Sequence, residues 1–234
     1  MNQQQDKPLR RSNVLKRLTN LYEKPRYLEV GVARGTTFDK VPAVRKVAVD
    51  PEFRFDHEAM AREHPEATYH PVTSDEYFNR IIDADDEFDV IYLDGLHVYD
   101  QTLRDLFNAL EHLQPRGVIV IDDTRPPTYL ASLPDRQQFF DVKRATGATE
   151  KVWMGDVYKA VYFIEAMCPY LSYATIDNNH GQTVVWRSRR DETPGYGLQD
   201  IGEVTFERFL QSQEVLRLQR FGEIRRRVRR DLGL

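Results

Sequence analysis

Two apolar segments separated by a helix-length spacer restrict the fold of this 234-residue chain more than any other feature. The segments are FDVIYLD at residues 88–94 and GVIVIDD at residues 117–123, and each ends in aspartate. Nearly continuous apolar runs of this kind are typical of parallel strands covered on both faces. Between them, residues 98–113 carry apolar side chains at helical spacing. The pattern predicts a strand, a crossover helix and a parallel strand, and therefore an α/β sheet.

Strand and helix patterns alternate through the rest of the first half of the chain. Three more strands are predicted there, at residues 26–32, 46–50 and 67–72. The second half differs, because the segments LSYATID and QTVVWRS stand on either side of a turn, Asn-Asn-His-Gly, and predict an antiparallel hairpin. The predicted fold class is α/β, a doubly wound Rossmann-like sheet that is mostly parallel and ends in an antiparallel hairpin.

Helices are predicted at both ends of the sheet-forming region. Residues 12–23 combine a possible N-cap, Ser12, with apolar positions at helical spacing, and residues 156–167 read as another helix. The tail carries an apolar stripe and a basic run, made of Phe221, Ile224, Val228 and residues 225–230. We expect one domain over residues 1–202, with the N-terminal helix included, and a basic amphipathic helical extension over residues 203–234.

The composition argues against several classes of protein. The formal net charge is −4 and the pI is about 5.9, so no global attraction to nucleic acid is expected. The single cysteine, Cys168, excludes an internal disulfide framework and fits a reducing compartment. The N-terminus lacks a signal-peptide core, and no apolar run approaches the ~20 residues that span a bilayer. We expect a soluble, cytoplasmic protein with neither membrane nor nucleic-acid partners.

The first strand runs into a glycine turn, LEVGVARG, which contains Glu29, Gly31 and Gly35. Glycine lets the backbone turn tightly and approach a ligand closely. The spacing is not that of the dinucleotide fingerprint, which needs three glycines. Asp50 ends the second strand, nineteen residues after Gly31, where an acid accepts hydrogen bonds from ribose hydroxyls. Together these residues predict a nucleoside site, although each alone is also explained by a tight turn.

The third strand is followed by TSDEYF, which places Ser74 and Asp75 at the next strand end. An adenine edge would lie at this position of the sheet. Thr73 or Ser74 can equally cap a helix, so both explanations of this segment stay open.

Carboxylates also end the two apolar strands on which the fold prediction depends. Asp94 follows one strand, and Asp122 and Asp123 follow the other, so a parallel sheet would bring three carboxylates to one edge. Unpaired carboxylates repel one another unless a cation lies between them, and an oxygen-only ligand set suits Mg²⁺. Asp94 could instead cap the following helix, and the aspartate pair could form an ion pair with Arg125.

Taken in order, these segments resemble the class I S-adenosylmethionine-dependent methyltransferases, and more closely the small bacterial methyltransferases of sugar and natural-product pathways. The matching segments are YLEVGVARGTTF, VAVDP, VTSDEYF, FDVIYLDGLHVYDQTLRDL, GVIVIDD and GDVYKAVYFI. The resemblance implies seven strands, the last one antiparallel. It also implies that the methionine part of the cofactor is cradled by Glu29, Gly31 and Gly35. Asp50 would hold the ribose, and Ser74 and Asp75 would lie on the adenine side.

The acidic strand ends resemble those of the metal-dependent O-methyltransferases of catechol and macrolide-sugar type. These enzymes carry an acid after the fourth strand and an acidic or amide pair after the fifth, which implies that Asp94, Asp122 and Asp123 bind Mg²⁺ here. Catechol-type enzymes place a lysine base three residues beyond the metal-binding acid, and His97 has that position. Because an imidazole with a pKa of about 6.5 accepts a proton at neutral pH, the expected catalytic residues are His97 and Asp94. His97 could instead be a structural hydrogen-bond donor.

The predicted function is therefore transfer of a methyl group from S-adenosylmethionine to a hydroxyl of a sugar or glycosylated small molecule, with Mg²⁺ and with His97 as base. Aromatic side chains near the predicted site could line the acceptor pocket, namely Tyr99, Tyr129 and Trp153. The alternatives are a metal-independent methyltransferase, an NAD-dependent oxidoreductase and a non-catalytic adenosyl-binding scaffold. The C-terminal helix is expected to contact a second copy of the chain or to cover the active site.

Overall fold

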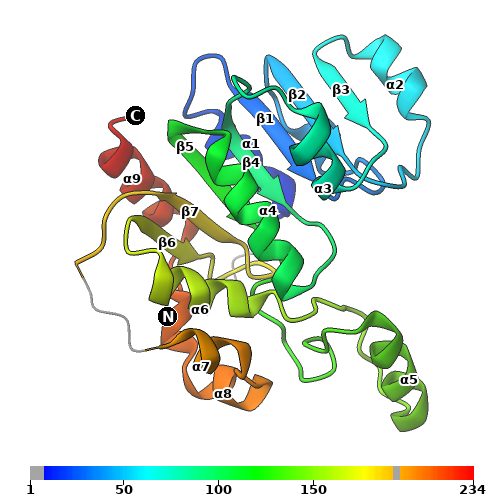
Figure 1. Ribbon diagram of the computed structural model, residues 1–234, viewed down its shortest axis with the longest axis vertical. Helices are drawn as coiled ribbons and strands as arrows, with labels where there is room; N and C mark the ends of the chain where they lie inside the picture. The colour runs from blue at the N-terminus through cyan, green and yellow to red at the C-terminus, as the bar shows by residue number, and fades with distance from the viewer. Residues whose placement is uncertain (1–7, 192–195) are drawn as a thin grey trace, which may run out of the picture.

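The structure, a computed structural model, describes residues 8–191 and 196–234 and is built around one seven-stranded sheet (Figure 1). The strand order is β3-β2-β1-β4-β5-β7-β6. β7 runs antiparallel to both of its neighbours, and every other neighbouring pair is parallel. The strands are β1 (Arg26–Val30), β2 (Arg45–Val49), β3 (Ala67–His70), β4 (Phe88–Leu93), β5 (Leu113–Ile121), β6 (Leu171–Thr175) and β7 (Thr183–Arg187). The predicted fold class, strand set and terminal hairpin are thus confirmed.

Helices connect the strands and cover both faces of the sheet (Figure 1). The longer ones are α1 (Arg11–Thr19), α2 (His57–Glu63), α4 (Tyr99–Glu111), α5 (Arg136–Thr146), α6 (Tyr158–Met167) and α9 (Phe221–Leu232). The shorter ones are η1 (Phe38–Lys40), α3 (Ser74–Glu76), η2 (Tyr77–Ile81), α7 (Leu198–Gly202), α8 (Phe206–Gln211) and η3 (Gln213–Leu216). In the part of the chain that the structure describes, no helix is long and apolar enough to cross a membrane.

Two apolar cores lie on opposite faces of the sheet. Along β4, side chains alternate between them, because successive residues of a strand point to opposite faces. Ile91 and Leu93 join the core that contains α4 and α6, whereas Val90 and Tyr92 join the core that contains α1 and α9. This double coverage explains why β4 and β5 read as nearly continuous apolar runs.

The N-terminal helix differs from its prediction at both ends. It begins at Arg11 with Arg10 at the N-cap, so the expected cap residue Ser12 lies inside the helix and is buried. It ends at Thr19, where the hydroxyl donates to backbone carbonyls of the preceding turn and competes with the helical hydrogen-bond pattern. Its buried side chains pack on the sheet, namely Val14, Leu15 and Leu18. The first residue of the helix, Arg11, is thereby held at one edge of the sheet.

The C-terminal segment packs on both faces of the sheet. Phe206 and Phe209 of α8 join the core that contains α6, and Phe221 and Ile224 of α9 join the core that contains α1. The chain leaves the helical path between α8 and α9, where Arg217 has a left-handed conformation with φ of +49°. The predicted apolar stripe is therefore buried, whereas the division into domains at residues 202 and 203 stays a prediction.

Between β5 and α6 the chain makes a long excursion that carries α5. α5 extends away from the sheet (Figure 1). It has a small apolar cluster of its own, which comprises Leu130, Leu133, Phe139, Val142, Ala148 and Trp153. Because this excursion begins directly after β5, it lies beside the carboxyl ends of the parallel strands.

Candidate active site

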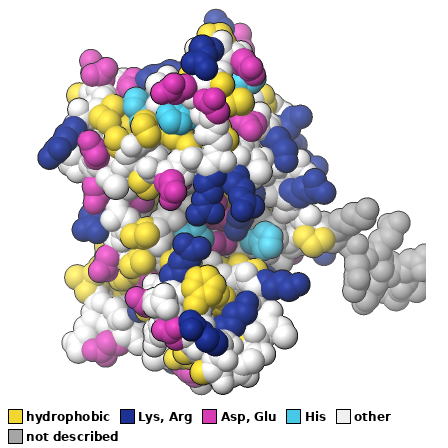
Figure 2. All heavy atoms as spheres, turned by 90° about the vertical axis from the view of Figure 1, so that its right-hand side faces the viewer, with side chains coloured by type: hydrophobic (Ala, Val, Ile, Leu, Met, Phe, Trp, Pro, Cys, Tyr) yellow, Lys and Arg dark blue, Asp and Glu magenta, His cyan; other side chains and the backbone are white. Residues whose placement is uncertain are grey.

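A cavity of about 570 Å³ lies at the carboxyl ends of the parallel strands. Most of the residues predicted for the site line it, namely Gly31, Asp50, Ser74, Asp75, Asp94 and His97. Arg11, Ala33, Leu96 and Gln101 also line it. The side of the molecule shown in Figure 2 has a central hollow with histidine and acidic side chains, bordered by lysine and arginine side chains. One space therefore joins the predicted nucleoside residues to the predicted catalytic residues.

Gly31 allows the two central loops of this edge to touch. Its φ is +87°, and a β-carbon placed on it would lie 1.9 Å from the carbonyl oxygen of Asp94. Only glycine combines this backbone conformation with such a close approach. The requirement is already present in the protein without a ligand, so packing explains this glycine as fully as cofactor contact does.

Asp50 organises the glycine turn from the neighbouring strand. Its carboxylate accepts hydrogen bonds from the backbone N–H groups of Ala33 and Glu52, both at 2.8 Å. The residue is only 8% exposed, yet it lines the cavity. A carboxylate held in this way keeps further lone pairs for ligand hydroxyls at a fixed position.

Gln101, which the sequence analysis did not single out, connects the residues predicted for the adenine side. Its Nε2 atom lies 3.2 Å from Ser74 Oγ, 3.0 Å from Asp75 Oδ1 and 3.0 Å from Asp105 Oδ1. The cap of α3 is Thr73, whose hydroxyl accepts from the backbone N–H of Glu76 at 3.2 Å. Helix capping therefore does not occupy the Ser74 side chain, whose hydroxyl instead contacts Gln101 and Asp105 at the cavity wall.

Glu29 and Gly35 do not line this cavity. The carboxylate of Glu29 is buried and accepts a hydrogen bond from the hydroxyl of Tyr27 at 2.5 Å. Burial raises the pKa of Glu29 well above its ordinary value, although the Tyr27 hydrogen bond and the charge of Lys46 lower it. The role of Glu29 and Gly35 toward the methionine part of the cofactor stays a prediction.

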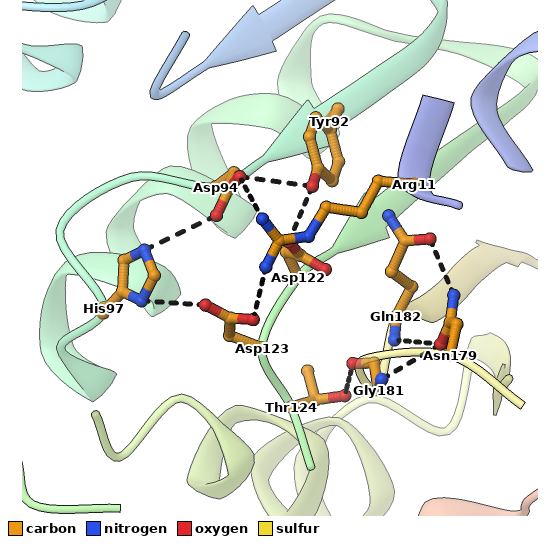
Figure 3. A network of polar contacts seen from close by, with 10 residues as sticks. All are labelled: Arg11, Tyr92, Asp94, His97, Asp122, Asp123, Thr124, Asn179, Gly181 and Gln182. Carbon is orange, nitrogen blue, oxygen red and sulfur yellow. Dashed lines mark hydrogen bonds and ion pairs between the residues drawn. The ribbon is translucent and has the colours of Figure 1, made fainter. Parts of the chain in front are cut away.

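The three aspartates at the ends of β4 and β5 do meet (Figure 3). The hydroxyl of Tyr92 lies 2.7 Å from Asp122 Oδ2 and 3.2 Å from Asp94 Oδ2. Asp122 is 2% exposed, and its Oδ1 atom has no hydrogen-bond partner. Burial and the neighbouring charges of Asp94 and Asp123 raise the pKa of Asp122 well above its ordinary value.

The cation among these aspartates is Arg11, from the first turn of α1 (Figure 3). Its Nε atom is 2.5 Å from Asp122 Oδ2, its Nη2 atom 2.8 Å from Asp123 Oδ1, and its Nη1 atom 3.8 Å from Asp94 Oδ2. Arg125, the partner that the sequence suggested, instead donates to the backbone carbonyl of Asp177. No local motif marked Arg11, because its partners follow it by more than 80 residues.

The position of the Arg11 guanidinium also determines whether the three carboxylates can bind the predicted Mg²⁺ ion. The guanidinium contacts all three carboxylates that were expected to bind Mg²⁺. Among the described residues, one group has ligand atoms close enough for an ion, within 4.8 Å of one another: Asp94, His97 and Asp123. A divalent ion there would lie beside the guanidinium, and two cations repel. As arranged, the residues do not fit the predicted oxygen-only Mg²⁺ site.

The side chain of His97 contacts two carboxylates and one aromatic ring. Its Nδ1 atom lies 3.0 Å from Asp123 Oδ2 and its Nε2 atom 3.5 Å from Asp94 Oδ1. Trp153 stacks on the imidazole, with ring centroids 5.3 Å apart and 12° between the ring planes. The backbone φ of His97 is +52° and that of Asp123 is +55°. Such conformations cost energy in residues other than glycine and gather at functional sites.

The two carboxylates change the acid–base behaviour that the sequence suggested for His97. Burial lowers the pKa of His97. The hydrogen bonds and charges of Asp123 and Asp94 raise it by more than burial lowers it, so that the pKa is about 10. The expected pKa of about 6.5 for His97 is therefore wrong, because the sequence did not show that both ring nitrogens face carboxylates. At neutral pH the imidazole is protonated and forms ion pairs with both aspartates.

Comparison with known proteins agrees with this geometry. Residues 28–124 match a family described as "Methyltransferase domain". This part of the chain therefore has the sequence pattern of a methyltransferase domain, and its fold is that of the class I methyltransferases. Their cofactor is S-adenosylmethionine. The match covers the glycine turn, Asp50, Ser74, Asp75, His97 and all three aspartates, whereas Arg11 and Trp153 lie outside it.

Solved structures share the fold of this methyltransferase at low sequence identity. The O-methyltransferase TomG of Streptomyces achromogenes, which is involved in tomaymycin synthesis and was solved with S-adenosylmethionine, is 17% identical. The similarity covers 76% of this chain and 79% of TomG, with a TM-score of 0.52. An O-methyltransferase of Bacillus cereus, solved with S-adenosylhomocysteine, is 14% identical over 76% of this chain and 80% of its own, with a TM-score of 0.51. No curated protein sequence matches the chain.

Proposed function

We propose that this methyltransferase transfers the methyl group of S-adenosylmethionine to a hydroxyl oxygen of a small molecule. The observation that carries the proposal is the single cavity that Asp50 and Ser74 share with Asp94 and His97. A nucleoside bound at Asp50 and a hydroxyl bound at His97 would lie in one continuous space. The solved structures similar to this fold include O-methyltransferases, which supports oxygen as the methyl acceptor.

The residues that line the cavity support one orientation of the cofactor in this proposal. The Asp50 carboxylate accepts hydrogen bonds from the ribose hydroxyls, and Ser74, Asp75 and Gln101 offer polar groups to the adenine edge. The methionine end then lies toward Gly31 and Asp94, at the end of the cavity where the aspartates gather. The methyl group therefore faces the part of the site that contains His97.

His97 is the group that takes the acceptor proton in this proposal. The hydroxyl oxygen attacks the methyl carbon in line with the departing sulfur, and its proton passes to the deprotonated fraction of the imidazole, which grows as the pH rises toward about 10. The products are a methyl ether, S-adenosylhomocysteine and an imidazolium. Asp94 and Asp123 stabilise that imidazolium, because each lies beside one ring nitrogen. Trp153 holds the ring plane by stacking.

The sequence analysis also predicted a Mg²⁺ ion and a sugar acceptor, and these two predictions differ in their support. We leave Mg²⁺ out of the proposal, because the guanidinium of Arg11 contacts the oxygens that would bind it. A sugar hydroxyl is kept as the proposed acceptor class on the resemblance to sugar and natural-product methyltransferases alone. The family match argues against the NAD-dependent alternative.

The first test is calorimetric titration of S-adenosylhomocysteine, with NAD in a parallel titration. We expect micromolar binding to the wild type and binding weakened about tenfold or more in Asp50→Ala, because one lost charged hydrogen-bond acceptor costs about 1.5–3 kcal/mol. Glu52→Ala is the matched control, since this exposed neighbour does not line the cavity. Absence of binding, or preference for NAD, would contradict the proposed function.

A further inference from the structure

We propose that Arg11 is a built-in cation of the acidic cluster, a positioning residue that takes the place of a divalent metal ion. The helix that carries it precedes residues 28–124, which match the methyltransferase family. The site of this enzyme is therefore completed by an element outside the matched domain. For its role in methyl transfer, the inference depends on the proposed function; for metal binding, it stands on the geometry alone.

The guanidinium reaches each carboxylate through a different nitrogen. Nε faces Asp122, Nη2 faces Asp123 and Nη1 faces Asp94 (Figure 3). A planar guanidinium presents its N–H groups in a fixed fork, so one side chain can orient several carboxylates together. Lysine, with a single nitrogen, carries the same charge but cannot make these three contacts at once.

Burial makes this cation necessary. Asp122 and Asp123 are each 2% exposed, so water does little to separate their charges. A buried carboxylate pair needs a cation or must hold a proton. In the described part of the chain, the arginine that forms ion pairs with these aspartates is Arg11, and His97 provides the second contact to Asp123.

The same contacts exclude a strong metal site. A divalent ion would compete with Arg11 for Asp122 Oδ2 and Asp123 Oδ1, and would be repelled by the guanidinium. Removing the guanidinium reverses both effects, because it frees oxygen ligands and leaves a net negative cluster. The wild type should therefore bind divalent ions weakly, and a variant without Arg11 should bind them better.

Arg11 also positions the proposed base indirectly. Asp94 and Asp123 contact both Arg11 and His97, through different oxygen atoms. The guanidinium thereby fixes the two carboxylates that hold the imidazole. α1 keeps the arginine in place, because its buried side chains Val14, Leu15 and Leu18 pack on the sheet.

The test is a Mn²⁺ titration followed by electron paramagnetic resonance, with the full chain throughout. We expect millimolar or weaker binding to the wild type, and a site about tenfold tighter or better in Arg11→Ala and Arg11→Gln, since both remove the cation. Arg11→Lys should stay close to the wild type because it keeps the charge. Arg17→Ala is the matched control, an exposed arginine in the last turn of the same helix.

Two results would overturn the inference. One is wild-type binding of Mn²⁺ as tight as that of Arg11→Gln. The other is a gained site that survives when Asp122→Asn is added to Arg11→Gln, because the ion would then lie elsewhere. S-adenosylhomocysteine binding by each variant verifies that the fold is intact. If the wild type binds Mn²⁺ weakly but no S-adenosylhomocysteine, the proposed function fails while the assignment of Arg11 stands.

Discussion

At the scale of single residues, Gly155 determines where His97 lies. Its φ is +64°, and a β-carbon on it would lie 1.7 Å from the carbonyl oxygen of His97. Gly155 also donates its backbone N–H to the carbonyl oxygen of Ala131 at 3.0 Å, which joins two parts of the excursion after β5. The position of the proposed base therefore depends on a glycine almost 60 residues away, which no catalytic motif would identify.

We expect Gly155→Ala to lower the free energy of unfolding by about 3 kcal/mol or more, from backbone strain and steric overlap together. Gly147→Ala separates the two causes, because Gly147 has a similar φ of +66° but no atom within 4 Å of the added carbon. It should cost only about 1–2 kcal/mol. Urea unfolding of both variants measures the difference, and equal costs would show that the contact with His97 does not matter.

At the scale of elements, α9 is one of the helices that pack on the sheet. Phe221, Ile224, Val228 and Leu232 are buried against the face that also holds α1. Trp186 of β7 donates a hydrogen bond to Asp231 at 3.0 Å, and Arg227 lies over the Trp186 ring. The sequence showed the amphipathic stripe, but the face on which it packs depended on the strand order.

Deletion of residues 221–234 is therefore expected to destabilise the whole protein. Each large apolar side chain contributes about 1.5–3 kcal/mol by burial, and a typical domain has only about 5–15 kcal/mol of net stability. Thermal unfolding followed by circular dichroism should show loss of most of the cooperative transition. The double variant Arg226→Glu/Arg229→Glu, which changes exposed charges only, should unfold close to the wild type. A stable truncated protein would instead favour a partner-binding role for the helix.

At the scale of the whole molecule, the ion pairs of His97 link global stability to pH. Its pKa is about 10 in the folded protein and about 6.5 in an unfolded chain. A raised folded-state pKa means that the fold favours the charged imidazole. The contribution to stability is complete below about pH 6.5 and is lost as the pH rises to about 10.

Between those pH values, His97 should lower the free energy of unfolding by at most about 1.4 kcal/mol for each pH unit. Urea unfolding at several pH values measures this slope. His97→Gln should remove the component, whereas His180→Gln, at an exposed turn, should keep it. The same slope in the wild type and in His97→Gln would mean that the imidazole does not carry the charge in the folded protein.

Local pattern determined the sheet and the outline of the site. The apolar runs that end at Asp94 and Asp122 predicted parallel strands, because only strands covered on both faces read as continuous apolar segments. Parallel strands with right-handed crossovers place their carboxyl ends along one edge, so the positions of Asp50, Asp94 and Asp122 at that edge followed from order along the chain. These features depend on spacing within about thirty residues, which a sequence displays directly.

Only the tertiary structure decided which side chains complete the site. Arg11, Gln101 and Trp153 reach it from three separate segments of the chain, and no periodicity relates them to their partners. The cation that the three carboxylates require was foreseen as a metal ion, and the fold supplies a guanidinium instead. The pKa of His97 likewise depends on two carboxylates arriving at both ring nitrogens. Contacts between distant segments depend on how elements pack, and that information is absent from any local stretch of sequence.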